Sequence, residues 1–130
     1  MKKTILALLL TLLSTNAMAE WTQVFSDKKL SIYVHLQSVQ ITSKTVKIWA
    51  LYDYTTPNIG PNNTPFLSMK SFDEYDCSQR TSRGLAHSFH KNNMGMGESA
   101  HTSSTPASEW TPVSPESVSE YLWKIACNEK

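Results

Sequence analysis

Several sequence features that define common protein classes are missing from this chain of 130 residues. Its longest apolar run, residues 5–13, is too short to cross a bilayer, which takes about 20 residues. Glycine-rich phosphate loops, nucleophile-elbow sequences and paired zinc-protease histidines are all absent, as are internal repeats. These absences argue against the commonest membrane-spanning and catalytic classes. They favour a non-enzymatic domain that needs no cofactor.

Residues 1–19 have the pattern of a secretory signal peptide. Two lysines form a basic start, the apolar run follows, and Ala17 and Ala19 supply a small-x-small cleavage site. We therefore expect cleavage after residue 19 and a single mature domain over residues 20–130. No cysteine lies at the cleavage site to carry a lipid. The mature chain should therefore have no stable membrane anchor and be periplasmic, extracellular or at the cell surface.

Excess positive charge is also missing. Loss of the leader's two lysines leaves 10 of the 12 basic residues against 11 acidic residues, a net charge of about −1. Nucleic-acid binders usually carry a strongly basic surface, so we expect no nucleic-acid partner. The mature length suits one compact domain with a modest core.

Cysteine is scarce, and both cysteines, Cys77 and Cys127, lie in the mature part. An even number in an oxidising compartment predicts a disulfide. Closing a loop of this length stabilises a domain by roughly 4 kcal/mol in the chain-entropy model. A redox-active or metal-binding pair is the alternative, but redox sites of the thioredoxin type keep their cysteines two residues apart.

Alternating apolar residues over much of the mature chain predict β-strands. Trp49 and Leu51 interrupt a polar face, and Phe72 is out of phase, which indicates a bulge or a partly covered second face. Residues 55–65 are dense in Pro, Gly and Asn and predict a loop. The predicted one-face sets are Leu30, Ile32, Val34 and Leu36, then Val46, Ile48, Ala50, Tyr52 and Tyr54, then Leu67, Met69, Tyr75 and Cys77.

Three carboxylates lie near the end of one predicted strand. Alternation places Asp73 on the face opposite to Glu74 and Asp76. We interpret the group as a solvated strand end rather than as an acid/base pair.

The period changes near the end of the sequence. Ser114 is a candidate N-cap and Pro115 suits the first helical position. An apolar stripe at helical spacing then predicts an amphipathic helix. The stripe consists of Val118, Tyr121, Leu122 and Ile125. Strands followed by one helix indicate an α+β fold, with the helix packed on a single antiparallel sheet.

The order of four segments resembles the surface-adhesin protein E-like family of Gram-negative bacteria. They read VKIWALYDY, PFLSMKSFDEYDC, NMGMGE and SEWTPVSPESVSEYLWKIAC. The resemblance implies a sheet of about six strands, a C-terminal helix and a bridge between Cys77 and Cys127. It also implies adhesion to host matrix proteins and a capacity to form homodimers. The cysteine that anchors the family's adhesin to a lipid is missing here, so the fold should carry over better than adhesion.

The segment HSFHKNNMGMGESAH contains soft and borderline metal ligands. These are His87, His90, Met94, Met96 and His101. On a strand, however, His87 and His90 point to opposite faces. The sequence KNNMGMG has the composition of a hairpin turn. We therefore predict no metal site, and keep a periplasmic copper- or zinc-binding protein as an alternative.

Two features are candidates for contact with a partner. Trp123 lies away from the apolar stripe of the helix, where it would be an exposed anchor or be covered by another segment. The predicted turn exposes a second set: Lys91, Asn92, Asn93 and Met94. The sequence thus predicts an exported module that recognises a protein partner. The alternative is an accessory or structural subunit of a periplasmic envelope complex.

Overall fold

A computed structural model describes residues 20–103 and 109–129 of the chain. Its elements are β1 (Thr22–Ser26), β2 (Leu30–Val34), β3 (Gln40–Ile41), β4 (Thr45–Ile59), β5 (Pro65–Asp76), β6 (Thr81–His90), β7 (Ser99–Ser103), β8 (Thr111–Pro112) and α1 (Val118–Ala126). Three short 3₁₀ turns join them: η2 (Leu36–Ser38), η3 (Pro61–Asn63) and η4 (Asn93–Gly95).

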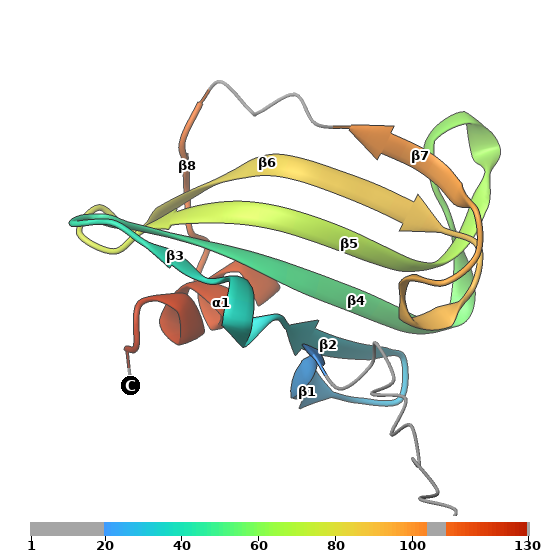
Figure 1. Cartoon of the computed structure of the whole chain (residues 1–130), viewed down its shortest axis with the longest axis horizontal. Helices are drawn as coiled ribbons and strands as arrows, with labels where there is room; N and C mark the ends of the chain where they lie inside the picture. Colours follow the sequence, from blue (N-terminus) through green and yellow to red (C-terminus); the bar gives the residue numbers. More distant parts are fainter. Residues whose placement is uncertain (1–19, 104–108, 130) are drawn as a thin grey trace, which may run out of the picture.

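All strands pair antiparallel in one sheet, in the order β1-β2-β4-β5-β6-β7. The short strands β3 and β8 pair with β4 and β6. The β3–β4 turn and the β6–β7 loop lie at opposite ends of the long strands (Figure 1). The predicted α+β class, with about six main strands and one C-terminal helix, is confirmed.

The core lies between the sheet and α1. On β2 and β4 it contains the residues that alternation placed on one face, among them Ile32, Ile48 and Ala50. Leu122 of α1 packs against them and is only 1% exposed. Burial of such side chains contributes roughly 1.5–3 kcal/mol each. The position of the helix is therefore fixed by apolar packing on one face of the sheet.

The disulfide joins the two layers. Cys77 directly follows β5, Cys127 directly follows α1, and their Cα atoms are 5.5 Å apart. The Cys77 amide also donates to the carbonyl of Lys44 in the β3–β4 turn. The predicted helix–strand bridge is confirmed.

The helix begins later than the sequence predicted. Its N-cap is Ser117, whose hydroxyl accepts from the amide of Glu120. A start at Pro115 is impossible because Glu116 has a φ of 60°, in the left-handed region. The Ser114 carbonyl instead accepts from the Ser117 hydroxyl.

Two strand boundaries also differ from the prediction. Strand β4 continues to Ile59, into the first part of the segment predicted as a loop, with an irregularity in its pairing between Asp53 and Asn58. Leu36 leaves the predicted apolar face because it lies in η2 and is exposed. The bulge expected near Phe72 lies on the partner strand β6, where Leu85 is the additional residue.

Candidate functional site

Trp123 is not an exposed anchor. Its side chain is 4% exposed, its indole N–H donates to the carbonyl of Asp76 at 2.9 Å, and the Arg80 guanidinium lies 4.6 Å above its ring. Of the two alternatives that the sequence left open for Trp123, an exposed anchor or a covered side chain, the structure has the covered one. Leu122 and Trp123 face the core, while Tyr121 packs against Phe25 of β1. The turn between β5 and β6, where Arg80 lies, covers the indole.

The sheet face opposite α1 carries the aromatic rings of Trp49 and Phe72. We call it the open face, and its central residues are Trp49, Leu51, Lys70, Phe72 and Glu74, which alternate with the core residues of β4 and β5. The Trp49 ring stacks on the Phe72 ring, with centroids 4.9 Å apart and planes 15° apart. Trp49, Leu51 and Phe72 are the apolar residues that, in the sequence, did not fit the alternation expected of a polar outer face.

Glu74 and Asp73 point to opposite faces, as alternation predicted, but Glu74 is buried and Asp73 is half-buried. Glu74 is buried on the open face, where it accepts from Arg83 at 2.7 Å and from the Thr45 hydroxyl at 3.0 Å. Asp73 lies on the helix side and accepts from the Ser71 hydroxyl at 2.7 Å. Burial raises the pKa of Asp73 to about 6. The prediction of a solvated strand end is therefore wrong for these two residues.

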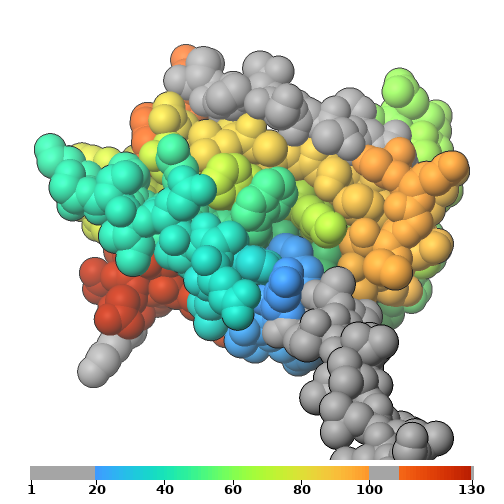
Figure 2. Space-filling model, viewed as in Figure 1, coloured from blue at the N-terminus to red at the C-terminus, as the bar shows by residue number. Residues whose placement is uncertain are grey.

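A hollow of about 440 Å³ opens on the open face beside Trp49. We call it the tryptophan hollow, and it is lined by Glu20, Trp21, His35, Ser38, Trp49 and Lys70. In Figure 2 the blue start of the described chain meets teal, green and yellow-green side chains near the centre of the visible face. Segments far apart in the sequence thus converge here.

Contacts between the lining residues hold the hollow in shape. His35 lies 3.1 Å from a Glu20 carboxylate oxygen, and its ring contacts the Trp21 ring edge-on at 5.4 Å. The amide of His35 donates to the carbonyl of Trp49. Among the residues that the structure describes, no carboxylate forms an ion pair with the Lys70 ammonium. The hollow therefore combines indole rings, a hydrogen-bonded carboxylate and a lysine without an ion pair.

The loop between β6 and β7, residues 91–98, folds over the open face next to Lys70. The Asp53 carboxylate accepts from the Asn93 side chain at 2.9 Å and from the Met94 amide at 2.7 Å. The Ser68 hydroxyl accepts from the Gly95 amide at 2.8 Å and donates to the Asn92 carbonyl at 2.6 Å. Two side chains from the central strands therefore fix the loop.

Glycine suits position 95 for two reasons. Its φ is 70°, and a Cβ atom there would lie 2.4 Å from the Cε of Lys70. Gly95 thus lets the Lys70 stem pass directly beneath the loop. The loop and the tryptophan hollow share Lys70 as their boundary.

The predicted binding residues of this loop divide into two groups. Asn93 and Met94 are hydrogen-bonded to Asp53, so they fix the loop to the sheet and are less available to a partner. Lys91 and Asn92 are exposed, and Met96, which was not among the predicted binding residues, is 60% exposed. Lys91 lies 3.5 Å from the Glu98 carboxylate. The surface that the loop offers therefore centres on Lys91 and Met96.

A family comparison bears on what this arrangement is for. The sequence profile of the surface-adhesin protein E family matches residues 21–128. The chain belongs to this family. Searching the curated protein sequences finds no significant match.

Solved structures of Haemophilus influenzae protein E have a similar fold. Crystal form II matches with a TM-score of 0.64 and 12% identity, over 85% of this chain and 88% of that chain. Protein E from non-typeable H. influenzae matches with a TM-score of 0.61 and 13% identity, over 88% and 79% of the two chains. Such low identities establish the fold alone. No helix of the described residues is long and apolar enough to cross a membrane.

The structure separates the ligands of the hypothetical copper site in this adhesin E domain. His87 lies on the helix side of the sheet and its ring contacts Phe89 at 5.4 Å. His90 lies on the opposite side, with Nε2 2.7 Å from the Ser88 hydroxyl, and burial together with Lys70 lowers its pKa. The His101 side chain lies outside the described residues. Within the described parts of the chain, no three His, Cys, Asp or Glu residues are grouped to hold a metal.

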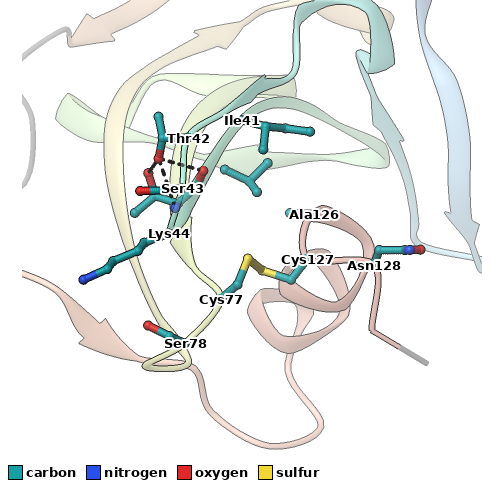
Figure 3. Close-up of a pocket in the computed structure, with 11 residues that line it drawn as sticks. Ile41, Thr42, Ser43, Lys44, Cys77, Ser78, Ala126, Cys127 and Asn128 are labelled. Atoms are coloured by element: carbon teal, nitrogen blue, oxygen red, sulfur yellow. Dashed lines mark hydrogen bonds between the residues drawn. A yellow bond between two sulfur atoms is a disulfide. The ribbon is translucent and has the colours of Figure 1, made fainter.

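A second hollow, of about 480 Å³, lies beside the disulfide (Figure 3). The β3–β4 turn forms one wall and the end of α1 forms the other. Its polar groups are largely used within the wall, since the hydroxyls of Thr42 and Thr45 bond to each other at 2.8 Å. None of its lining residues in the described parts of the chain carries an aromatic ring. It offers less for recognition than the tryptophan hollow does.

Proposed function

We propose that this chain is exported after removal of residues 1–19 and acts as a non-enzymatic binding module for a protein partner. The open face and the exposed part of the β6–β7 loop form the contact surface. Membership of the surface-adhesin protein E family supports a binding role. A matrix protein of a host is the partner that fits an adhesive member of this family.

The observation that carries the proposal is the anchoring of the loop by Asp53 and Ser68. A loop that is already fixed loses little conformational freedom when it binds, and more of the contact energy then appears as affinity. Its exposed side chains supply both an apolar and a cationic contact, Met96 and Lys91. Methionine is common on surfaces that adapt to protein partners.

Localisation tests the adhesive form of the proposal. Intact cells are treated with a protease and then fractionated by osmotic shock. An adhesin is cut by the external protease and is retained on the cell. Recovery of the uncut chain only in the osmotic-shock fraction would contradict adhesion.

Binding to immobilised matrix proteins tests the contact surface. We expect saturable binding by the mature chain and a loss of about tenfold in affinity for the double variant Lys91→Ala/Met96→Ser. Ile59→Ser is the matched control, because Ile59 is 66% exposed near the β4–β5 turn. Equal binding by the loop variant and the control variant would rule out the loop as the contact surface.

A further inference from the structure

We infer that the tryptophan hollow binds an acidic pyranose, a six-membered sugar ring that carries a carboxylate. The inference goes beyond the proposed protein partner, since it concerns a small-molecule subsite with its own chemistry. Its evidence lies in the charge, the rings and the hydrogen-bonding groups that line the hollow.

The charge of the hollow favours an anionic group on the ligand. Lys70 lines the hollow, and its side chain passes beneath Gly95 of the β6–β7 loop. No described carboxylate forms an ion pair with it. Glu20, the one acid among the described residues that line the hollow, is hydrogen-bonded to His35 instead. A ligand carboxylate would therefore give Lys70 a charge-assisted partner that the described chain does not supply.

The rings of the hollow favour a flat, partly apolar ligand. Phe72 stacks on one face of Trp49, and Trp49 also lines the hollow. Trp21 and His35 meet edge-on, with planes 78° apart, and form a corner next to it. A pyranose has an apolar C–H surface for an indole ring and hydroxyl groups at its rim. The hollow, at about 440 Å³, has room for one such ring.

The hydrogen-bonding groups favour a sugar over an acidic side chain of a protein. A sugar hydroxyl both donates and accepts, so it can use a carboxylate acceptor and an ammonium donor in the same site. Glu20 and Lys70 supply one of each. An aspartate or glutamate of a partner would pair with Lys70 but would offer no hydrogen-bond donor to the Glu20 carboxylate, whereas a sugar hydroxyl would. The mixed lining therefore suits a ligand that is polyhydroxylated as well as acidic.

A nuclear magnetic resonance titration tests the inference, because the indole N–H signals report separate places. The chain has four tryptophans, of which Trp21 and Trp49 line the hollow. Trp123 is bonded to Asp76, and Trp110 lies beneath Arg83, so both serve as internal references. The ligands are methyl glucuronide, methyl galacturonide and N-acetylneuraminic acid. Methyl glucoside and methyl galactoside are the matched neutral sugars.

We expect at least one acidic sugar to shift the Trp21 and Trp49 signals saturably, with a dissociation constant of about 1 mM. The neutral sugars should bind about tenfold more weakly. Lys70→Gln should weaken binding by the same factor. Lys47→Gln is the matched control, because Lys47 lies on the same face opposite Glu74 and outside the hollow.

Three results would overturn the inference. One is no shift with any acidic sugar up to about 50 mM. Another is equal binding of the acidic and neutral sugars. The third is an equal effect of the Lys70 and Lys47 substitutions. The titration reports on the hollow, whereas the matrix-protein assay reports on the loop, so failure of one proposal is distinguishable from failure of the other.

Discussion

The two faces of β4 differ in what covers them. On one face Ile48 and Ala50 are sealed by the helix, and the disulfide fixes that helix to the end of β5. On the other face Trp49 stacks on Phe72 and borders a hollow with charged groups at its rim. Under the proposed function, alternate residues of one strand would serve stability and recognition separately. Substitutions on the two faces should therefore have different consequences.

The largest effect on stability should come from the disulfide. The double variant Cys77→Ala/Cys127→Ala removes a bridge between positions 50 apart in the sequence, and we expect a loss of about 4 kcal/mol in the free energy of unfolding. Urea denaturation of the purified variant measures this loss. The Trp49 environment should stay native below the transition. An early change in its fluorescence would mean that the open face depends on the clamp.

The next effect compares one residue on each face. Leu122→Ala removes a fully buried side chain and should reduce the free energy of unfolding by about 3 kcal/mol. Trp49→Ala removes a larger but half-buried ring and should reduce it by about 2 kcal/mol, because solvent can enter the space that the ring leaves. Paired urea titrations give both values. Similar losses for both variants would remove the distinction between the faces.

Asp73 makes the helix side sensitive to pH. Its pKa is raised from 3.8 to about 6 by burial, so the folded chain favours the protonated carboxyl. The stability that this group contributes is complete below about pH 4. It falls as the pH rises from about 4 to 6 and stays low at higher pH. A shift of this size is worth up to about 3 kcal/mol.

Asp73→Asn should therefore stabilise the chain at pH 7 by about 2 kcal/mol. The gain is smaller than the full value because the amide must also take over the carboxyl's hydrogen bond with Ser71. The gain should vanish near pH 4. Thermal unfolding of both chains from pH 4 to 8 measures it. A gain that is independent of pH would mean that removal of the buried charge is not its cause.

The smallest effect on global stability should come from the loop anchor. Asp53→Ala removes the acceptor of the Asn93 side chain and the Met94 amide, for about 1 kcal/mol. Hydrogen exchange at Met94 should accelerate much more than exchange in the core. Asp27→Ala is a matched control, because Asp27 makes the same kind of turn contacts with Lys29 and Leu30. Acceleration in the control variant too would show that the loop responds to any loss of stability.

The sequence predicts the layers of this fold well, because burial of one face imposes a period of apolar residues that the order of the residues reveals. The alternation in β4 identified its core face correctly, and the helical stripe identified α1. The pattern could not predict the rotation of α1 about its axis, that is, which of its side chains face the core. Its nine residues carry apolar side chains over a wide arc, and the choice of Trp123 over Tyr121 depends on β1 and the β5–β6 turn.

The candidate site was only partly predictable. The phase of Trp49, Leu51 and Phe72 indicated a covered second face, and the turn at residues 91–97 was identified from its Asn and Gly content. Asp53 and Ser68 gave no signal, because their partners are remote in sequence and polar residues are common on strands. The tryptophan hollow likewise requires Trp21, His35 and Lys70 to meet through the pairing of distant strands.

The position of Glu20 at the tryptophan hollow has a consequence for maturation. Under the proposed cleavage after residue 19, Glu20 becomes the first residue, and its α-amino group acquires a positive charge at the rim of the hollow. Precursor and mature chain would then differ in the electrostatic potential of the same surface. Cleavage during secretion would therefore give this surface its final charge. An affinity tag fused before Glu20 would keep the charge that the surface has in the precursor.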